Sequence, residues 1–563
     1  MTQTRRETWL FWLFALLILA TGLGLRDPWP ADEPRFALVA RHMVESGNWL
    51  FPMRGSELYS DKPPLFMWMQ ASVLWLTGNL RIAFLLPSLL AALGTLWCVT
   101  DLGARLWTRR IGLYAGWITL LTIQFTWQAK KAQIDPMVVF WITLSCYALL
   151  RHVLHGPNWR LWALGWAAAG LGTITKGVGV IALLLLIPAA VASLRGWAGV
   201  RIHARDAKFW LGPLAFVAAC GVWLVPMLVA AFGQDSSAYS AYVNDILLRQ
   251  TVTRYANSWH HGQPWWYFIE VLLTAWLPTA LALPWAIPAW RRRLRRRDAR
   301  FLIPLGWVLL VFVFFSIPSG KRDMYILPAL PMLALALAPL LPGILRRPNA
   351  QHLLLGFVLV FSLAALGAGL AMLLGDPGFE RGFMEGRDAH VADGLAWMFA
   401  AIGGFGLGSA LWFGRRRAHA ALVAMLTALW LLYSLVGAPL LNDGSSSRGL
   451  MRAVGAAIGP RAELGLVGWR EQQLLMADRP AADFGFKRDA GLQFADGVRW
   501  QHARPQARWL LVEEGDGLPS CVDDTRAREM AITNGRRWWL LDGEATRACR
   551  LDAIANTVGK DTQ

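Results

Sequence analysis

Long apolar stretches recur along the chain, and short polar or charged clusters separate them. A helix needs about 20 apolar residues to cross the ~30 Å hydrocarbon core of a bilayer, so each stretch is a candidate membrane span. The pattern gives fourteen candidates, near residues 8–25, 64–78, 82–104, 112–128, 135–152, 160–175, 178–194, 208–232, 265–289, 301–317, 325–345, 353–374, 395–413 and 419–438.

The second candidate, 64–78, is short and opens with two prolines, and the charge pattern decides whether it crosses. Cytoplasmic loops carry an excess of Lys and Arg. If this segment crosses, the basic cluster "RRRLRRRDAR" at 291–300 lies outside. If it lies along the interface, that cluster and those at 346–352 and 414–419 lie inside. The sequence therefore predicts thirteen spans, a cytoplasmic N-terminus and an external C-terminal tail.

The composition agrees with this fold class. Of the 563 residues, 55% are hydrophobic and 16% are charged, whereas a soluble protein carries about a quarter charged residues. The net charge of +18 is explained by basic loops at the cytoplasmic edge rather than by nucleic-acid binding. We therefore expect a polytopic α-helical membrane protein.

The last part of the chain, 440–563, is polar and has no long apolar stretch. The segments "AELGLVGW", "ARWLLVEEGD" and "RRWWLLDGE" are typical of strands, and "SSRGLMRAVGAAIG" is typical of a helix. These patterns predict a transmembrane domain at 1–439 and a small external α/β domain at 440–563. Cys521 and Cys549 lie in this second domain, where a disulfide is possible only in an oxidising compartment.

The first external loop, 26–81, contains a predicted amphipathic helix that Gly47 ends. One apolar face at helical spacing is formed by Phe36, Val39, Ala40, Met43 and Val44. Such a helix lies in the headgroup zone of the membrane. Asp32 stands at its expected N-terminus, where the helix dipole favours an ionised carboxylate. The alternative is that Asp32 only caps the helix.

Ionisable residues gather at the external ends of the predicted spans. Charged groups at membrane depth are costly, so they indicate function. If they converge on one cavity, Lys and Arg would hold a phosphate and carboxylates would hold a sugar or take a proton. For each cation alone, headgroup binding is the alternative. The residues are Asp32, Glu33, Arg35, Asp61, Lys62, Lys130, Lys131, Asp135, Lys176, Arg249, Arg254, His260, His261, Lys321, Arg322, Asp323 and Tyr325.

The same residues lie in motifs that resemble a known family. The pieces are "DEPRFALVARHMVESGNW", "DKPPLFMWM", "QIDPMVVFW", "TKG", "LLRQTVTRYANSWHHGQPWWYF" and "SGKRDMYILPALPMLAL". In order and spacing they resemble the GT-C-fold glycosyltransferases of the 4-amino-4-deoxy-L-arabinose transferase and protein O-mannosyltransferase type. The resemblance covers residues 8 to 440 and implies about thirteen spans, interfacial helices in the first external loop and a C-terminal periplasmic domain.

The resemblance also implies an activity. An inverting glycosyltransferase of this type moves a sugar from a polyprenyl (undecaprenyl) phosphate donor, without a nucleotide cofactor, at the periplasmic face of the bacterial inner membrane. The acceptor stays open between lipid A, another glycan and a protein, and the sugar stays open too, because fold and family do not fix the substrate.

Individual residues match the motif positions of the family. Asp32 matches the catalytic acid of the first loop, and Glu33 stands beside it. Lys62 matches a lysine that contacts the donor phosphate. Phe36 replaces the usual tyrosine, which removes one hydroxyl from the site. The other positions that the resemblance assigns to the donor phosphate or sugar are Arg35, Tyr59, Asp135, Lys176, Arg254, Lys321 and Tyr325.

A divalent metal ion is the one cofactor that the resemblance implies. In the arabinose-transferase branch a Glu at the position of Asp61 is linked to a metal, with a His of the long loop as its partner. Asp61 is one methylene shorter than that Glu. The nearest match to the His is Asn244, and His260 lies further along the loop.

The mechanism expected from these roles is direct displacement at the anomeric carbon. Asp32 would orient the acceptor hydroxyl and take its proton, while the cations stabilise the departing lipid phosphate. Two alternatives are a transporter or flippase for a lipid-linked sugar and a non-catalytic scaffold. Transporters tend to show paired halves and helices interrupted at mid-membrane, whereas the charged residues here gather at one face.

Overall fold

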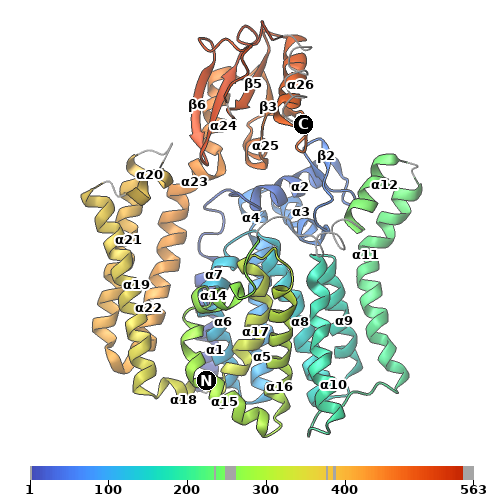
Figure 1. Ribbon diagram of the computed structural model, residues 1–563, viewed down its shortest axis with the longest axis vertical. Helices are drawn as coiled ribbons and strands as arrows, with labels where there is room; N and C mark the ends of the chain where they lie inside the picture. The colour runs from blue at the N-terminus through green and yellow to red at the C-terminus, as the bar shows by residue number, and fades with distance from the viewer. Residues whose placement is uncertain are drawn as a thin grey trace.

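The computed structural model describes residues 3–233, 236–247, 262–375, 378–384, 389–515 and 517–549. Within them, a bundle of long helices carries a smaller domain at one end, and the N-terminus lies at the opposite end of the bundle (Figure 1). The basic segment that ends α15 (Leu283–Arg295) lies at the N-terminal end, as does α18 (Leu341–Leu345), which precedes Arg346 and Arg347.

Each of the thirteen predicted spans is helical over most of its length. In chain order these segments are α1 (Gln3–Ala20), α4 (Leu80–Ala83) with α5 (Leu86–Leu106), α6 (Arg109–Leu121) with α7 (Ile123–Ala129), α8 (Ile134–His155), α9 (Trp159–Thr173), η1 (Gly177–Leu185) with α10 (Leu186–Leu194), η2 (Ala207–Trp210) with α11 (Leu211–Gly233), α14 (Tyr267–Thr274) with η4 (Thr279–Ala282) and α15, α16 (Ala299–Ser316), η5 (Asp323–Ala329) with α17 (Leu330–Leu337), α19 (Pro348–Leu374), α21 (Ala389–Phe413) and α22 (Ala418–Leu432).

By length and composition, eight helices in the described part of the chain could cross a membrane. A ninth is the pair α14 and α15, which is bent by 95° at its break. The other four predicted spans are shorter helices or, for α1, carry charged residues at one end. Length and composition alone therefore support eight or nine of the thirteen, and the number thirteen stays a prediction.

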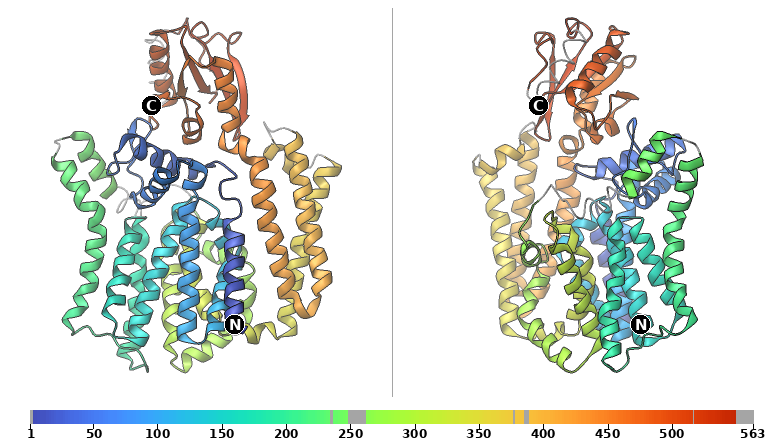
Figure 2. Two further views of the ribbon diagram at one scale, coloured as in Figure 1. Left: turned by 180° about the vertical axis from the view of Figure 1, so that it is seen from behind. Right: turned by 45° about the vertical axis from the view of Figure 1, so that its right-hand side comes forward.

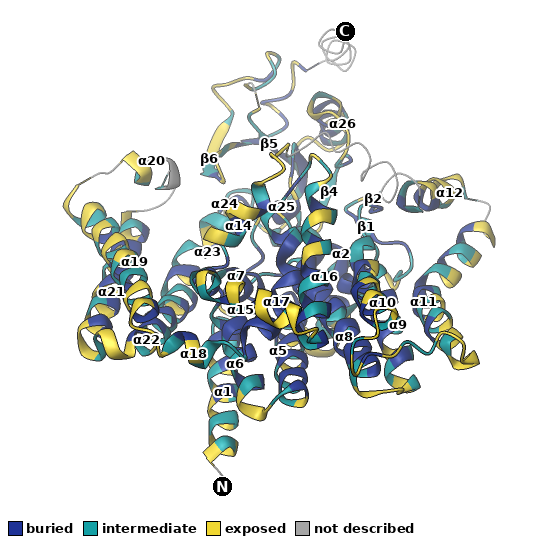
Figure 3. Ribbon diagram, turned by 60° about the horizontal axis from the view of Figure 1, so that its bottom comes forward, coloured by how far each residue is buried: buried dark blue, intermediate teal, exposed yellow. Residues whose placement is uncertain are grey.

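Large apolar side chains point outward from the bundle over most of its height. On α11, Leu214, Val217 and Val229 are each more than 60% exposed, and Figure 3 shows exposed residues along α11, α19 and α21. Water-facing surfaces rarely carry such continuous apolar area. These faces fit contact with lipid chains, as the apolar stretches of the sequence predicted.

The segment 64–78 forms α3 (Leu65–Thr77), which is too short to cross a bilayer. Together with α2 (Glu33–Ser46) it lies between the helix bundle and the C-terminal domain, in views from the front and from behind (Figures 1 and 2). The prediction that this segment does not cross the membrane agrees with this placement.

The amphipathic helix of the first loop has the predicted bounds, with Gly47 ending α2 in the left-handed conformation at φ 72°. Its apolar face differs from the prediction in its surroundings. Phe36, Val39 and Met43 belong to a buried cluster that also contains Phe66 of α3 and Met451 of the C-terminal domain. This face is therefore buried inside the protein, because the C-terminal domain covers the helix instead of leaving it on the headgroups.

The C-terminal domain is built on a five-stranded sheet in the order β4-β3-β5-β7-β6. The first three strands pair in parallel, and β7 is antiparallel to β5 and β6. Cys521 and Cys549 form a disulfide. The elements are α24 (Arg448–Ile458), β3 (Glu463–Val467), α25 (Glu471–Met476), β4 (Ala481–Asp483), α26 (Ala490–His502), β5 (Arg508–Glu513), β6 (Arg528–Thr533) and β7 (Arg536–Leu541).

A continuous helix leads from the bundle into this domain. It contains α22, the π-helical turn η7 (Tyr433–Gly437) and α23 (Ala438–Ser446). The predicted boundary between residues 439 and 440 falls within this helix, which runs unbroken to Ser446. The boundary itself stays a prediction.

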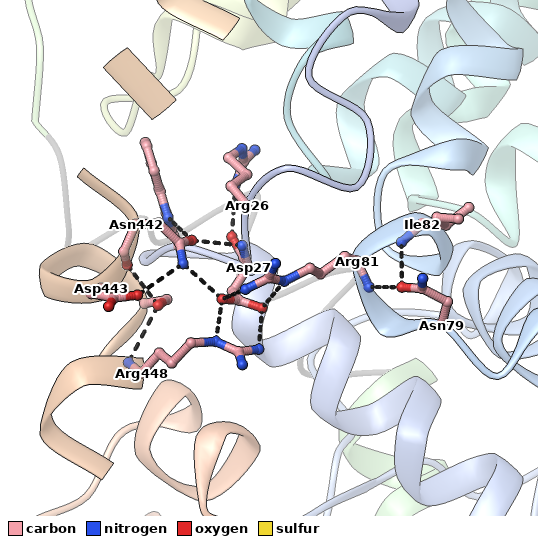
Figure 4. A network of polar contacts seen from close by, with 10 residues as sticks. Arg26, Asp27, Asn79, Arg81, Ile82, Asn442, Asp443 and Arg448 are labelled. Atoms are coloured by element: carbon pink, nitrogen blue, oxygen red, sulfur yellow. Dashed lines mark hydrogen bonds and ion pairs between the residues drawn. The ribbon is translucent and has the colours of Figure 1, made fainter. Parts of the chain in front are cut away.

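A buried carboxylate ties the first loop to both parts of the molecule (Figure 4). The fully buried side chain of Asp27 accepts hydrogen bonds from Arg81 at 2.9 and 3.0 Å and from Arg448 at 2.5 and 2.6 Å. Asn442 adds a bond of 2.8 Å to the carboxylate and accepts one from the Asp27 N–H. The loop is thereby joined to α4 through Arg81 and to the C-terminal domain through Arg448.

This junction predicts a loss of stability in acid. Although burial alone would raise the pKa of Asp27, the hydrogen bonds from Arg81, Arg448 and Asn442 lower it from 3.8 to about 2. Because the folded pKa lies below the unfolded one, about 2 kcal/mol of stability is present above pH 4 and is lost as the pH falls toward 2.

We expect Asp27→Asn to lower the melting temperature in detergent at pH 6 and to flatten its dependence on pH between 4 and 2. The matched control is Asp496→Asn, which removes a carboxylate that pairs with Arg488 and Arg499 in the C-terminal domain. Identical pH profiles for wild type and Asp27→Asn would contradict the assignment.

Candidate functional site

Asp32 lies at the N-terminus of α2 and turns its carboxylate toward the bundle. Gln133 donates a hydrogen bond to one oxygen at 3.0 Å, and Arg35 lies 3.4 Å from the other. Within the described residues, the side chain makes no hydrogen bond that caps the helix. The reading of Asp32 as a simple cap is therefore wrong, and its carboxylate, about a fifth exposed, is open to a ligand.

Glu33 has a different environment from its neighbour. Both its oxygens accept bonds from Arg26, at 2.5 and 2.7 Å, and they also accept the backbone N–H groups of Trp29 and Ala132. The two charged side chains are about 5% exposed. A carboxylate with all these donors is held in place, so the geometry favours a structural role for Glu33 over the predicted catalytic one.

A chain of opposite charges runs from Asp32 into the first-loop hairpin, which is formed by β1 (Met53–Arg54) and β2 (Glu57–Leu58). Arg35 donates through Nε to Glu471 of the C-terminal domain at 2.8 Å. The same Glu471 oxygen lies 3.5 Å from Arg54, and Arg54 lies 3.8 Å from Asp61. Asp32 and Asp61 are thus two ends of one charged cluster.

Tyr59 is buried within this cluster. Burial raises the pKa of its phenol, although Arg35 and Arg54 act in the opposite direction. Burial also works against the charge of Arg35, but Glu471, Tyr59 and Asp32 together outweigh it and raise the pKa of that guanidinium. Tyr59 is therefore neutral and Arg35 cationic at neutral pH. The Tyr59 hydroxyl has no hydrogen-bond partner in the described part of the chain.

A second cluster joins three more of the predicted residues. The Lys176 ammonium lies 2.7 Å from Asp135 and 5.0 Å from the centre of the Tyr325 ring. A close approach of backbones places Lys176: a Cβ on Gly179 would lie 2.1 Å from the carbonyl carbon of Gly172. Only glycine lets the turn between α9 and η1 close this tightly.

The two clusters are neighbours because both involve the N-terminal end of α8, where Gln133 is the N-cap and Asp135 lies in the first turn. Gln133 contacts Asp32, and Asp135, two residues later, contacts Lys176. Lys131 precedes them and stacks on Trp127 at 4.2 Å. Burial lowers the pKa of Lys131, and the nearby carboxylates of Glu33, Asp323 and Asp32 partly offset this effect. The segment 131–135 therefore contacts residues of both clusters.

An apolar groove of about 620 Å³ lies between α14, α15 and α16. Phe268 lines it and is 6.5 Å from Phe315 between ring centres, and Phe315 is 5.5 Å from Tyr325. Aromatic contacts therefore connect the groove to the Lys176 cluster. Its other lining residues include Trp265, Leu272, Ile287, Trp290, Leu309 and Ile317.

The remaining predicted donor-binding residues have separate positions. Lys62 donates to the carbonyl of Asp61 at 3.0 Å, beside the first cluster. Lys321 is buried and donates to the carbonyl of Gln263 at 2.9 Å, so its hydrogen bond goes to a loop backbone rather than to the Lys176 cluster. Arg254 lies outside the described residues.

Two of the residues predicted for a metal site, Asp61 and Asn244, lie on segments that touch each other. Asn244 ends α12 (Ser237–Asn244) with its side chain exposed, and the next residue, Asp245, bonds to Ser60 beside Asp61. No three His, Cys, Asp or Glu side chains are grouped to hold a metal among the described residues, and His260 is not one of them. A metal at Asp61 therefore stays a prediction, and no step below depends on it.

Sequence reasoning missed three residues of the site. Gln133 lies in the quoted "QIDP" motif, so its neighbour Asp135 could have pointed to it. Arg54 is one of several basic residues in the first loop, and no sequence motif distinguishes it from the others. Glu471 comes from a separate domain 436 residues after its partner Arg35, and no local pattern indicates such a contact.

Comparison with known proteins places this chain in a family. Residues 61–229 match the family described as dolichyl-phosphate-mannose-protein mannosyltransferase. The chain is 30% identical over 461 residues to the undecaprenyl phosphate-alpha-4-amino-4-deoxy-L-arabinose arabinosyl transferase of Pseudomonas aeruginosa, covering 78% of this chain and 77% of that protein. A second such transferase, from Sodalis glossinidius, is 31% identical, with 68% and 69% covered.

The match to the transferase of Pectobacterium carotovorum is 30% identical and spans 66% of that protein's length. Among solved structures, ArnT from Cupriavidus metallidurans without ligand aligns with a TM-score of 0.72 at 19% identity, covering 97% of this chain and 99% of that one. The same protein bound to undecaprenyl phosphate gives 0.71, with 95% and 98% covered. The predicted GT-C fold of a multi-pass membrane protein is confirmed, and the chain belongs to the family of the undecaprenyl phosphate-alpha-4-amino-4-deoxy-L-arabinose arabinosyl transferases.

Proposed function

We propose that this chain is a glycosyltransferase that moves a sugar from an undecaprenyl phosphate donor to an envelope acceptor such as lipid A. The observation that carries the proposal is the pair of adjacent clusters, Asp32 with Arg35 and Asp135 with Lys176, beside an apolar groove. The relatives are named as arabinosyl transferases of an undecaprenyl phosphate sugar, which supports transfer over the transport alternative. Aminoarabinose is the first sugar to test.

The donor is assigned to the Lys176 side of the site. Its phosphate would bind the Lys176 ammonium. Lys62, beside Asp61 in the first cluster, is the second predicted phosphate ligand. Its polyprenyl tail would lie in the groove between α14 and α16, where Phe268 and Phe315 lead from the groove to Tyr325. A lipid chain in an apolar groove and a phosphate on an ammonium group satisfy both halves of an amphipathic donor.

The reaction follows from the position of Asp32, whose partner Gln133 lies two residues before Asp135, the partner of Lys176. The acceptor oxygen attacks the anomeric carbon, the bond from that carbon to the phosphate oxygen breaks, and undecaprenyl phosphate leaves with the electron pair. If the acceptor is a hydroxyl, Asp32 takes its proton. If it is a phosphate, no proton needs to move and Asp32 positions the acceptor. Lys176 stabilises the charge that develops on the leaving phosphate.

The orientation proposed for the chain puts this site in the periplasm. Two features support it. The disulfide between Cys521 and Cys549 requires an oxidising compartment for the C-terminal domain. The arginines that end α15 lie at the opposite end of the bundle, where the positive-inside rule expects the cytoplasm.

The variant Asp32→Asn tests both the proposed glycosyl transfer and the proposed role of Asp32 as the base that takes the acceptor proton. A deletion strain is complemented with wild type, Asp32→Asn or Glu45→Gln, and lipid A, glycans and envelope proteins are compared by mass spectrometry. We expect one sugar-modified species to depend on wild type and to fall by about 100-fold or more with Asp32→Asn. Glu45 is exposed on the same helix, paired only with Arg41 among its described neighbours, so its variant should act as wild type. Full activity of Asp32→Asn would remove Asp32 as the base.

Lys176→Ala tests the donor site. Loss of a charge-assisted contact to the phosphate should raise the KM for the undecaprenyl phosphate donor by roughly tenfold or more, measured in detergent with purified protein. Lys208→Ala, at an exposed lysine of η2, is the control and should leave KM unchanged. An unaltered KM and kcat for Lys176→Ala would exclude it from donor binding.

The orientation is checked with protease on intact spheroplasts. A C-terminal epitope should be removed without lysis, because the C-terminal domain faces the periplasm, while an N-terminal epitope should survive until the cells are broken. The reverse pattern would place the site in the cytoplasm and contradict the proposal.

A further inference from the structure

The C-terminal domain forms hydrogen bonds with the first-loop hairpin that carries Arg54. Asp483, at the end of β4, accepts the backbone N–H of Ser56 at 3.1 Å and its hydroxyl at 2.7 Å. Glu57 accepts the backbone N–H of Lys487 at 3.2 Å. These bonds join residues more than 400 positions apart, and they fix the hairpin at the surface of the domain.

Arg54 itself is enclosed from both sides. Its guanidinium carbon lies 3.7 Å from the centre of the Phe486 ring of the C-terminal domain and 5.5 Å from that of Tyr59. Its side chain is only 5% exposed. A buried cation between two rings gains from their negative faces, yet it still needs an anion, because burial of a lone charge is costly.

Glu471 supplies that anion to two arginines at once. One of its oxygens accepts from Arg35 at 2.8 Å and lies 3.5 Å from Arg54. Its side chain is also 5% exposed. Because Arg35 points its Nε at Glu471, its other nitrogens reach Asp32 only at 3.4 Å. Glu471 therefore keeps Arg35 from forming a short, two-bonded ion pair with Asp32.

We propose that Glu471 is a positioning residue of the active site, contributed by the C-terminal domain. It holds Arg35 and Arg54 so that the Asp32 carboxylate stays available to the acceptor. This inference rests on the proposed transfer reaction. Without Glu471, Arg35 turns to Asp32 and occupies its oxygens, so the chemical step slows while the donor, bound at Lys176, is held as before.

The test uses the full-length chain purified in detergent with three variants. Glu471→Ala removes the anion and leaves a space between the two guanidinium groups. Glu471→Gln keeps the shape of the side chain and removes its charge. If the alanine variant fails to fold, kcat and KM are measured on the glutamine variant instead. Glu463→Ala is the matched control, since Glu463 also pairs with two arginines, Arg504 and Arg508, but on the exposed face of the same domain.

We expect Glu471→Ala to lower kcat by roughly tenfold or more, because small misplacements of catalytic groups are this costly, with the donor KM within about twofold of wild type. The kcat of Glu471→Gln should lie between those of wild type and Glu471→Ala. Sodium acetate at tens of millimolar should restore several-fold activity to Glu471→Ala by placing a carboxylate between the arginines. Sodium chloride at the same ionic strength should not, and neither salt should change Glu463→Ala.

A thermal measurement needs no transfer activity. Acetate should raise the melting temperature of Glu471→Ala relative to chloride, and should leave wild type and Glu463→Ala unchanged. If wild type transfers sugar but Glu471→Ala keeps its kcat, the inference fails and the proposed function stands. If wild type transfers nothing, the proposed function fails. Loss of stability in Glu471→Ala without acetate rescue of either kcat or melting temperature would show a purely structural clamp and overturn the positioning role.

Discussion

The buried carboxylate of Asp27 is the contact on which the arrangement of the molecule depends. Two arginines and an asparagine bind it: Arg81 of α4, Asn442 of the connecting helix and Arg448 of the C-terminal domain. Removing either arginine would leave the buried carboxylate with fewer donors, and taking one partner from a buried charge costs more than the net gain from the pair. The first loop, the bundle and the outer domain are therefore locked at a point five residues before Asp32.

The polar site solves the problem of keeping charges at the edge of a bilayer. Glu33 forms an ion pair with Arg26, Asp135 forms one with Lys176, and Glu471 pairs with the two arginines Arg35 and Arg54. In each pair the opposite charges offset the cost of burial. Asp32 differs, since within the described residues its carboxylate contacts one amide and one more distant guanidinium. A partly free carboxylate among satisfied neighbours is the feature expected of a residue that must bind substrate.

Much of this could be predicted from the sequence where the signal is local. Length and apolarity identified the helices, the 3.6-residue period identified α2, and the cost of charge at membrane depth identified Asp32, Asp135 and Lys176. Contacts between distant segments were out of reach: Arg35 and Glu471 are 436 positions apart, and neither lies in a pattern that requires the other. The same limit explains why Glu33 was predicted to be catalytic. Adjacent acidic residues cannot be distinguished in a sequence, and only the fold shows that Arg26 and the Ala132 N–H donate hydrogen bonds to Glu33.

The unbroken helix from Arg415 to Ser446 has a geometric consequence. Its 32 residues rise about 48 Å at 1.5 Å each, well beyond the ~30 Å of hydrocarbon. A stiff helical rod, rather than a flexible linker, therefore sets the height of the C-terminal domain above the bundle and its rotation about the helix axis. Adding one residue to that rod would turn everything above it by about 100°. Such a rotation would separate Glu471 of the C-terminal domain from Arg35 of the first loop, so the length of this helix is constrained by a contact at the polar site.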